Sequence, residues 1–172
     1  MKPTIIGLIS DTHGLLREEA VEALRGSELI LHAGDIGERG ILEELRKLAP
    51  VVAVRGNVDT EEWAQALPTT AVIEAGSATI FMLHNLLELD LNPAAAGFQV
   101  VVSGHSHQHC QLEKNGVLYI NPGSAGPRRF RLPVTVARLD LRRTRWGVQF
   151  FELEVVTAVR QKSTDGLRLR KF

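Results

Sequence analysis

The first two-thirds of the chain alternates short apolar runs with segments that have helical spacing. Three runs have the length of buried strands, at residues 4–9, 28–31 and 51–54. Residues 15–25 and 41–48 carry apolar side chains three and four positions apart among charged ones, which predicts amphipathic helices, and residues 61–67 predict a shorter helix. This alternation predicts a βαβ arrangement with parallel strands.

Beyond Pro68 the pattern changes to short strands. The segments predicted as strands are residues 70–74, 79–83, 99–103, 111–113, 117–120, 133–141 and 147–155. Gly76 and the pair Asn115-Gly116 lie between neighbouring segments and predict two hairpins. Residues 161–172 show no clear pattern, and we expect this tail to be mobile. We therefore predict a single α/β domain over residues 1–172, in which two sheets pack together.

Composition narrows the class of protein. The 172 residues are 44% hydrophobic and 23% charged, the balance of an ordinary globular domain. A single cysteine, Cys110, excludes an internal disulfide. No apolar run approaches the roughly 20 residues of a membrane helix, and the first residues do not resemble a signal peptide. We expect a cytoplasmic protein without membrane partners.

The formal net charge of zero hides an asymmetry. Residues 1–127 carry 8 basic and 16 acidic side chains, whereas residues 128–172 carry 12 basic and 4 acidic ones. A uniformly basic nucleic-acid binder is therefore excluded, and we expect no stable complex with nucleic acid. The acidic part of the chain is also rich in histidine, which favours a bound cation.

Metal-capable side chains follow five separate apolar runs. Carboxyl ends of strands are where ligand sites form in α/β sheets, so we expect these side chains to converge on one edge. Carboxylate, amide and imidazole ligands suit divalent ions such as Mn²⁺, Fe²⁺ or Zn²⁺, and the lack of cysteine argues against a structural zinc site. The candidate ligands are Asp11, His13, Asp35, Asn57, His84, His105 and His107.

Each residue also has an ordinary structural explanation. Asp11 could cap the helix near Leu15, Asn57 could be a turn residue, and His84 could be a satisfied core histidine. Two histidines in a His-x-His pair are usually just surface residues. Five coincidences at strand ends in one chain are hard to obtain from turn chemistry alone, so the joint pattern favours the metal site.

The candidate ligands lie in five short motifs: Asp11-Thr12-His13, Gly34-Asp35, Gly56-Asn57-Val58-Asp59, His84 and Gly104-His105-Ser106-His107. The motifs and their order along the chain resemble those of the calcineurin-like metallophosphoesterase superfamily. The small size and Asn121-Pro122-Gly123-Ser124 are similar to its short prokaryotic phosphodiesterase branch. The resemblance covers about residues 3–154 and implies a four-layer α/β/β/α sandwich with two mixed β-sheets.

The resemblance also implies a ligand set and a reaction. One ion would be held by Asp11, His13, Asp35 and His107, and the other by Asp35, Asn57, His84 and His105, with Asp35 as the bridge. A hydroxide between the ions would attack phosphorus. The expected enzyme is a hydrolase of phosphoric diesters with weak phosphomonoesterase activity. It would require two divalent metal ions, for which Mn²⁺ is the preferred candidate and Fe²⁺, Ni²⁺ or Zn²⁺ are alternatives. Its substrate would be a small phosphodiester or a nucleotide, and the chain could form a homodimer or homotetramer.

Two positions depart from the family pattern. Many members have a histidine after Gly-Asn that protonates the leaving group, and Val58 stands there instead. Asn85 follows His84 where the family usually has glycine; it can adopt left-handed geometry and could reach into the pocket.

Several other polar residues near the predicted ligands could have a functional or a structural role. Asp59 would either orient a ligand or cap the next helix, and His32 is expected in the core or behind a ligand. The catalytic candidates are Asn57, His84 and Asp59, and the substrate-binding candidates are Asn57, Asn85 and Arg128, although Arg128 could equally lie in a solvated basic loop.

A non-catalytic role is the competing hypothesis. The retromer sorting subunit of eukaryotic cells is similar in fold, works as a protein-binding scaffold and lacks part of the histidine set. All seven ligand positions are intact here, which favours the enzyme.

Overall fold

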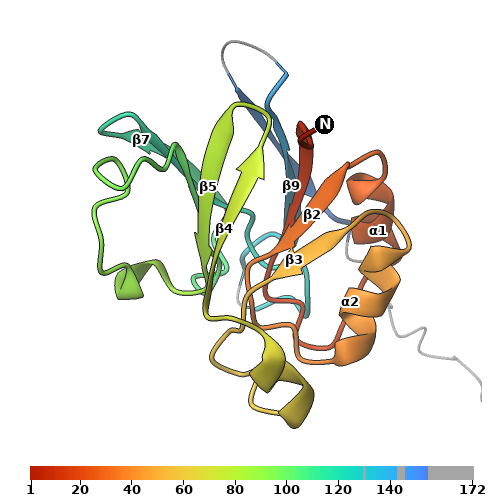
Figure 1. The fold of residues 1–172 in the computed structure, drawn as a ribbon. Helices are drawn as coiled ribbons and strands as arrows, with labels where there is room; N and C mark the ends of the chain where they lie inside the picture. The colour runs from red at the N-terminus through yellow and green to blue at the C-terminus, as the bar shows by residue number, and fades with distance from the viewer. Residues whose placement is uncertain (130, 143–145, 155–172) are drawn as a thin grey trace, which may run out of the picture.

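Two five-stranded β-sheets packed face to face form the framework of the chain (Figure 1). The structure is a computed structural model that describes residues 1–129, 131–142 and 146–154. Both sheets contain parallel and antiparallel neighbours, so the prediction of two packed mixed sheets is confirmed.

The first sheet has the order β10-β9-β1-β2-β3. Its strands are β1 (Ile5–Ile9), β2 (Leu29–His32), β3 (Val51–Ala53), β9 (Thr135–Asp140) and β10 (Gly147–Glu152). The first three are parallel, and β9 and β10 complete the sheet as antiparallel strands. Helices α1 (Glu18–Leu24) and α2 (Arg39–Arg46) cover its outer face.

The second sheet has the order β4-β5-β6-β8-β7. Its strands are β4 (Thr70–Ala75), β5 (Ala78–Leu83), β6 (Val100–Val102), β7 (Cys110–Lys114) and β8 (Val117–Asn121). The segment after β5 covers the outer face, where Phe98 stacks on Phe81 with ring centroids 5.0 Å apart. This segment is the fourth layer, and its helical part is the short 3₁₀ helix η2 (Leu86–Glu88).

Strand alternation assigns the side chains of the central strand to two cores. Ile6 and Leu8 of β1 point into the core between the sheets, whereas Ile9 packs under the helices. Gly7 lies on the helix side, where a Cβ atom would be 2.8 Å from the Ser27 hydroxyl and 2.9 Å from Leu24. The missing side chain therefore allows α1 to pack closely on the strand.

Several predicted boundaries differ from the observed ones. The helix expected at residues 15–25 begins only at Glu18, so Asp11 is not its cap. His13 and Gly14 both have positive φ, which prevents helix formation immediately before Leu15. The helix expected at residues 61–67 is the 3₁₀ helix η1 (Glu62–Ala66). The end of the last predicted strand and the tail 161–172 lie outside the described residues.

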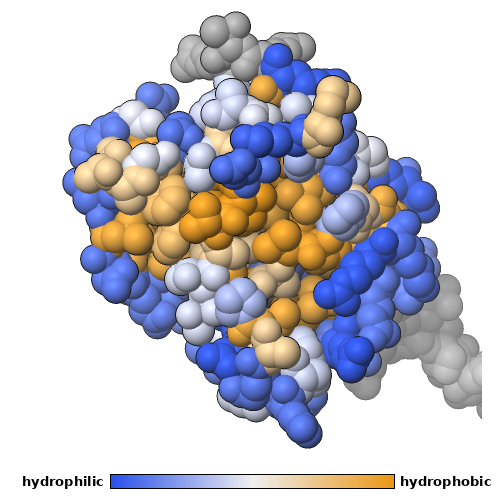
Figure 2. All heavy atoms as spheres, viewed as in Figure 1, coloured by the Kyte–Doolittle hydropathy of each residue, from blue (hydrophilic) through white to orange (hydrophobic). Residues whose placement is uncertain are grey.

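One face of the molecule is apolar at its centre. Figure 2 shows hydrophobic residues gathered over β3, β4 and β5, with charged residues around them. Both β3 and β4 are edge strands of their sheets. Among the described residues, no helix has the length and apolar character needed to cross a membrane.

Candidate metal centre

The seven candidate ligands lie in the loops that follow β1, β2, β3, β5 and β6. Because these strands run in one direction within each sheet, their carboxyl ends meet at the same end of the sandwich, the lower end in Figure 1. The described structure brings the ligands together there in two adjoining groups.

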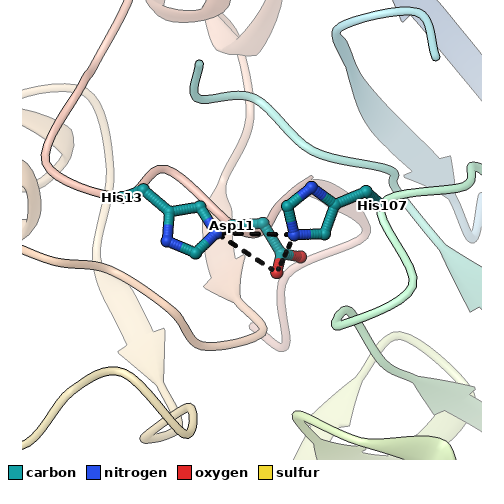
Figure 3. A group of neighbouring side chains, drawn as sticks. All are labelled: Asp11, His13 and His107. Carbon is teal, nitrogen blue, oxygen red and sulfur yellow. Dashed lines mark hydrogen bonds and ion pairs between the residues drawn. The ribbon is translucent and has the colours of Figure 1, made fainter. Parts of the chain in front are cut away.

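The first group consists of Asp11, His13 and His107 (Figure 3). The Nε2 atom of His107 lies 3.2 Å from Oδ1 of Asp11 and 3.4 Å from Nε2 of His13. His13 Nε2 lies 3.9 Å from the same carboxylate oxygen. Three ligand atoms from two distant loops thus face one small volume.

The second group consists of Asp35, Asn57, His84 and His105. Oδ1 of Asn57 lies 3.1 Å from both His84 Nε2 and His105 Nδ1, which are themselves 3.4 Å apart. The second oxygen of Asp35 is 3.3 Å from His84 Nε2. That same oxygen is 3.9 Å from His13 Nε2 of the first group, so Asp35 lies between the two groups.

Neighbouring hydrogen bonds leave the ligand atoms free. Oδ2 of Asp11 accepts hydrogen bonds from the Ser10 hydroxyl (2.6 Å) and the His105 amide (3.1 Å), whereas the buried Oδ1 has no hydrogen-bond partner among the described residues. Oδ1 of Asp35 accepts from the Val58 amide, and the other oxygen faces the histidines. In each carboxylate, hydrogen bonds therefore fix one oxygen, and the other oxygen faces the neighbouring histidines.

His84 is oriented in the same way. Its Nδ1 lies 2.7 Å from the Ala33 carbonyl, to which it donates, so Nε2 presents its lone pair to the Asn57 oxygen. Two acceptors at 3.1 Å with no proton between them repel each other unless a cation lies among them.

The donor set fits divalent ions. Ligands bound at about 2.1 Å to one ion are separated from each other by about 3.0–3.4 Å, and the separations around Asn57 and His107 agree with this spacing. A buried carboxylate oxygen without a partner and a group of facing acceptors are both explained by cations at these positions.

Backbone strain is concentrated in the ligand loops. Six described residues other than glycine have positive φ, and five of them are candidate ligands: Asp11, His13, Asp35, His105 and His107. Left-handed backbone is unfavourable for such residues and is retained where the surrounding structure requires it. Here it directs five side chains toward the two groups.

Glycines allow the loops to approach one another. A Cβ atom on Gly56 would collide with the Asp35 carboxylate and backbone, and one on Gly104 would collide with the Ser10 hydroxyl. Gly56 therefore allows the loops after β2 and β3 to approach closely, and Gly104 allows the same for the loops after β1 and β6.

Neighbouring groups shift the pKa values of His84 and Asp35 in opposite directions. Burial opposes charge on His84, but the Asp35 carboxylate and the Ala33 carbonyl outweigh it and raise the pKa of His84. Burial likewise opposes charge on Asp35, yet His84 and the Val58 amide lower the pKa of Asp35.

The pKa of His13 is shifted the opposite way. Burial lowers it, and the positive charge of Arg129 lowers it further. Arg129 directly follows the substrate-binding candidate Arg128, and nothing in the sequence pattern shows which of these arginines lies near the ligands. Neighbouring Arg128, expected to bind substrate, donates from Nε to the Leu132 carbonyl at 3.2 Å.

The Asp59 side chain joins the loops after β2 and β3. Its buried carboxylate accepts hydrogen bonds from the Gly37 amide (2.9 Å) and the Gly56 amide (2.8 Å), and it caps no helix. Of the two roles expected for it, the geometry supports orientation of the adjoining ligands. The two hydrogen bonds join the loops that carry Asp35 and Asn57, and the catalytic role expected for Asp59 stays a prediction.

Asn85 does not have the conformation expected for it. Its φ is −104°, outside the left-handed region, because the residue begins η2 rather than a glycine-like turn. The side-chain oxygen accepts from the Leu87 amide (3.1 Å), and the side-chain nitrogen donates to Glu88 (3.3 Å). These contacts use the side chain within its own loop, which counts against its reaching substrate.

Asn121, the first residue of the Asn-Pro-Gly-Ser motif, supports one of the ligand loops. Its amide nitrogen donates to the Gly104 carbonyl (2.7 Å) and the Ser106 hydroxyl (3.0 Å), and its oxygen accepts from the Gly123 amide. It therefore holds the loop that carries His105 and His107. Its position in an Asn-Pro-Gly turn was the available signal.

Comparisons with known proteins agree with this geometry. Residues 5–144 match the model of the calcineurin-like phosphoesterase superfamily domain. The chain is 36% identical over 149 residues to a probable metallophosphoesterase of Methanothermobacter thermautotrophicus, an alignment that covers 79% of this chain and 86% of the relative.

Solved structures extend the likeness. The fold is similar to that of an archaeal phosphodiesterase with a TM-score of 0.72 at 25% identity, covering 86% of this chain and 99% of the other. It is also similar to Vps29 of Chaetomium thermophilum, with a TM-score of 0.70 at 19% identity over 87% and 95% of the two chains. The second likeness shows the fold alone.

Proposed function

Because the chain belongs to the calcineurin-like phosphoesterase superfamily, in its branch of small archaeal and bacterial phosphodiesterases, we propose that it hydrolyses phosphodiesters with two divalent ions. The observation that carries the proposal is the convergence of seven side chains whose carboxylate, amide and imidazole atoms face one another.

The ligand atoms assign each ion. Asp11, His13 and His107 would hold one ion, Asn57, His84 and His105 would hold the other, and Asp35 would touch both. When bound, the ions would lower the pKa of a water molecule and neutralise charge on the phosphoryl group. Mn²⁺ is our first choice, and Fe²⁺, Ni²⁺ and Zn²⁺ suit the same ligands.

Residues of the chain supply orientation and charge. The Ser10 hydroxyl and the His105 amide fix the carboxylate of Asp11, and the Val58 amide fixes that of Asp35. The guanidinium of Arg129 adds positive charge beside His13 and would attract an anionic substrate. Arg128 donates to the Leu132 carbonyl through Nε, and within the described residues its terminal nitrogens would serve the same purpose.

The residue after Asn57 limits the leaving group. Val58 has no proton to donate, so the departing oxygen must leave as a stable anion, and general acid catalysis worth about 10²–10⁴-fold is absent at this position. This favours diesters of alcohols with low pKa and leaves phosphomonoesterase activity weak.

Hydrolysis of bis(p-nitrophenyl) phosphate tests the proposal. We expect turnover with Mn²⁺, none after chelation, and a loss of at least about 100-fold in His105→Ala, which removes a ligand of the second ion. Absence of metal-dependent turnover, or a His105→Ala variant as active as the wild type, would leave the scaffold hypothesis. The predicted homodimer or homotetramer can be tested by sedimentation, and a cytoplasmic location stays a prediction.

A further inference from the structure

The loop after β8, residues 122–134, packs directly against the first group of candidate ligands. The Ser124 hydroxyl and the Gly126 amide both donate to the Asp11 carbonyl, at 3.0 Å and 3.2 Å. A Cβ atom on Gly126 would collide with the Thr12 carbonyl oxygen, so the two backbones touch there. This loop therefore has a fixed position beside the metal centre.

Three arginines lie where this loop meets the first group. The Arg17 guanidinium donates to the Gly126 carbonyl at 3.3 Å, so it lies against the loop. Arg128 and Arg129 line one small cavity together with the candidate ligand His107. We call these three residues the arginine cluster: Arg17, Arg128 and Arg129.

Carboxylates do not neutralise the arginine cluster in the part of the chain that the structure describes. None of its three side chains forms an ion pair there with an aspartate or glutamate. Arg17 and Arg128 each donate to a backbone carbonyl, which does not cancel their charge. Burial lowers the pKa of His13 and the charge of Arg129 lowers it further, so the field of the cluster extends to the ligands.

The loops around the second group carry the opposite charge. Residues 55–67 and 84–92, which include the candidate ligands Asn57 and His84, contain five acidic side chains and one arginine. Residues 122–133 contain three arginines and no acidic side chain. An anionic substituent of the substrate is therefore favoured on the side of the first group and disfavoured on the side of the second.

Formal charges show that a simple diester would not use all of this positive charge. Two divalent ions would bring four positive charges, and a hydroxide together with the buried carboxylates Asp11, Asp35 and Asp59 would bring four negative ones. The loaded centre would then be neutral, and a diester adds one negative charge. The arginine cluster supplies three positive charges, which leaves two for a further anionic group.

We propose that the substrate is a phosphodiester that also carries a terminal phosphate, and that the arginine cluster binds this second anionic group. The inference rests on the proposed function. The metal centre would hold the scissile diester, while the guanidinium forks of the cluster match the oxygens of the terminal phosphate. A diester with neutral ester arms would leave the cluster without a partner and would be the poorer substrate.

Two nucleotide esters with the same leaving group test the cluster. Thymidine 5′-(p-nitrophenyl phosphate) has a neutral nucleoside arm, and its 3′-phosphate derivative adds a terminal phosphate. In both, one water displaces p-nitrophenolate from phosphorus. For the Mn²⁺-loaded protein at fixed free Mn²⁺, we expect kcat/KM to be about tenfold higher for the derivative. Arg128→Gln and Arg129→Gln should each reduce this ratio about threefold or more, because each removes a guanidinium.

A matched control lies on α2. Arg46 is exposed in the last turn of this helix, so Arg46→Gln makes the same change in charge elsewhere and should keep the wild-type ratio. Calorimetry gives a readout without turnover: thymidine 3′,5′-bisphosphate should bind the Mn²⁺-loaded protein about tenfold more tightly than thymidine 5′-phosphate. Arg129→Gln should reduce this difference about threefold or more, and Arg46→Gln should leave it unchanged.

The outcomes separate this inference from the proposed function. If both esters are hydrolysed with equal kcat/KM, or if Arg128→Gln and Arg129→Gln keep the wild-type ratio, the cluster does not bind a second anionic group and the proposed function stands. A ratio that falls equally in Arg46→Gln reflects the net charge of the protein and also overturns the inference. If neither ester is hydrolysed with Mn²⁺, the proposed function fails, and the inference that rests on it fails with it.

Discussion

His32 provides a quantitative test of the packing beneath the site. Its side chain is fully buried, with Nδ1 accepting from the Gly34 amide (3.3 Å) and Nε2 3.0 Å from the Thr12 hydroxyl. That hydroxyl donates to the Ile36 carbonyl, so it accepts a hydrogen bond from Nε2. The ring therefore joins the loops after β1 and β2 in its neutral form.

Burial has a calculable effect on stability. It lowers the pKa of His32 from 6.5 to about 4. Between these values the unfolded chain binds more protons than the folded one, so the stability is present above pH 6.5 and is lost as the pH falls toward 4. From this shift, we calculate a loss of about 2 kcal/mol between pH 7 and pH 5.

Urea unfolding of the metal-free protein at pH 7 and pH 5 measures this loss. His32→Gln keeps a donor for the Thr12 hydroxyl but cannot titrate, so its free energy of unfolding should fall by about 2 kcal/mol less over this interval than that of the wild type. Other titrating groups are common to both proteins and cancel in the comparison. Equal losses in the two proteins would refute the buried neutral histidine.

Three further substitutions probe the site. Val58→His restores an acid, so the rate on p-nitrophenyl phosphate relative to bis(p-nitrophenyl) phosphate should rise about tenfold or more; an unchanged ratio contradicts the explanation from the missing acid. Arg129→Ala removes a cation near His13 and should raise the pKa of His13, measured by NMR titration of the metal-free protein. An unchanged pKa of His13 would show that Arg129 does not lie close to it. Gly104→Ala adds a Cβ atom that collides with the Ser10 hydroxyl and should weaken Mn²⁺ binding by about tenfold or more. Gly147→Ala, with nothing within 4 Å, should leave Mn²⁺ binding unchanged in the same calorimetry.

The position of the candidate site was predictable from the sequence. Asp11, Asp35 and Asn57 each follow a short apolar run, and the ends of neighbouring parallel strands must meet at one edge. Period-two and helical spacing likewise predicted the two sheets, because burial on one or both faces leaves a readable pattern. The helices α1 and α2 were predicted with longer boundaries or with shifted ones.

The conformation of the loops was not predictable in the same way. Asp11 and His13 have left-handed backbone where their amides donate hydrogen bonds to the carbonyls of Gly34 and Asp35, in the loop after β2. Such contacts join residues far apart in the chain and leave no local pattern. The late start of α1 follows from the same constraint.

Side-chain partners explain the other differences. Asn85 was expected to adopt the left-handed backbone of the usual glycine. Instead, its side-chain oxygen accepts a hydrogen bond from the Leu87 amide, and the residue caps the start of η2. Asp59 was expected either to cap a helix or to orient a ligand, and two glycine amides decide for orientation. Short polar side chains have several possible partners, and only the fold determines which one is present.

Anomalous diffraction from crystals of the Mn²⁺-loaded protein tests the central claim most directly. The account predicts two manganese peaks about 3.5–4 Å apart, one among Asp11, His13 and His107 and one among Asn57, His84 and His105, with the Asp35 carboxylate in contact with both. A single peak, or two peaks that do not share Asp35, would contradict it.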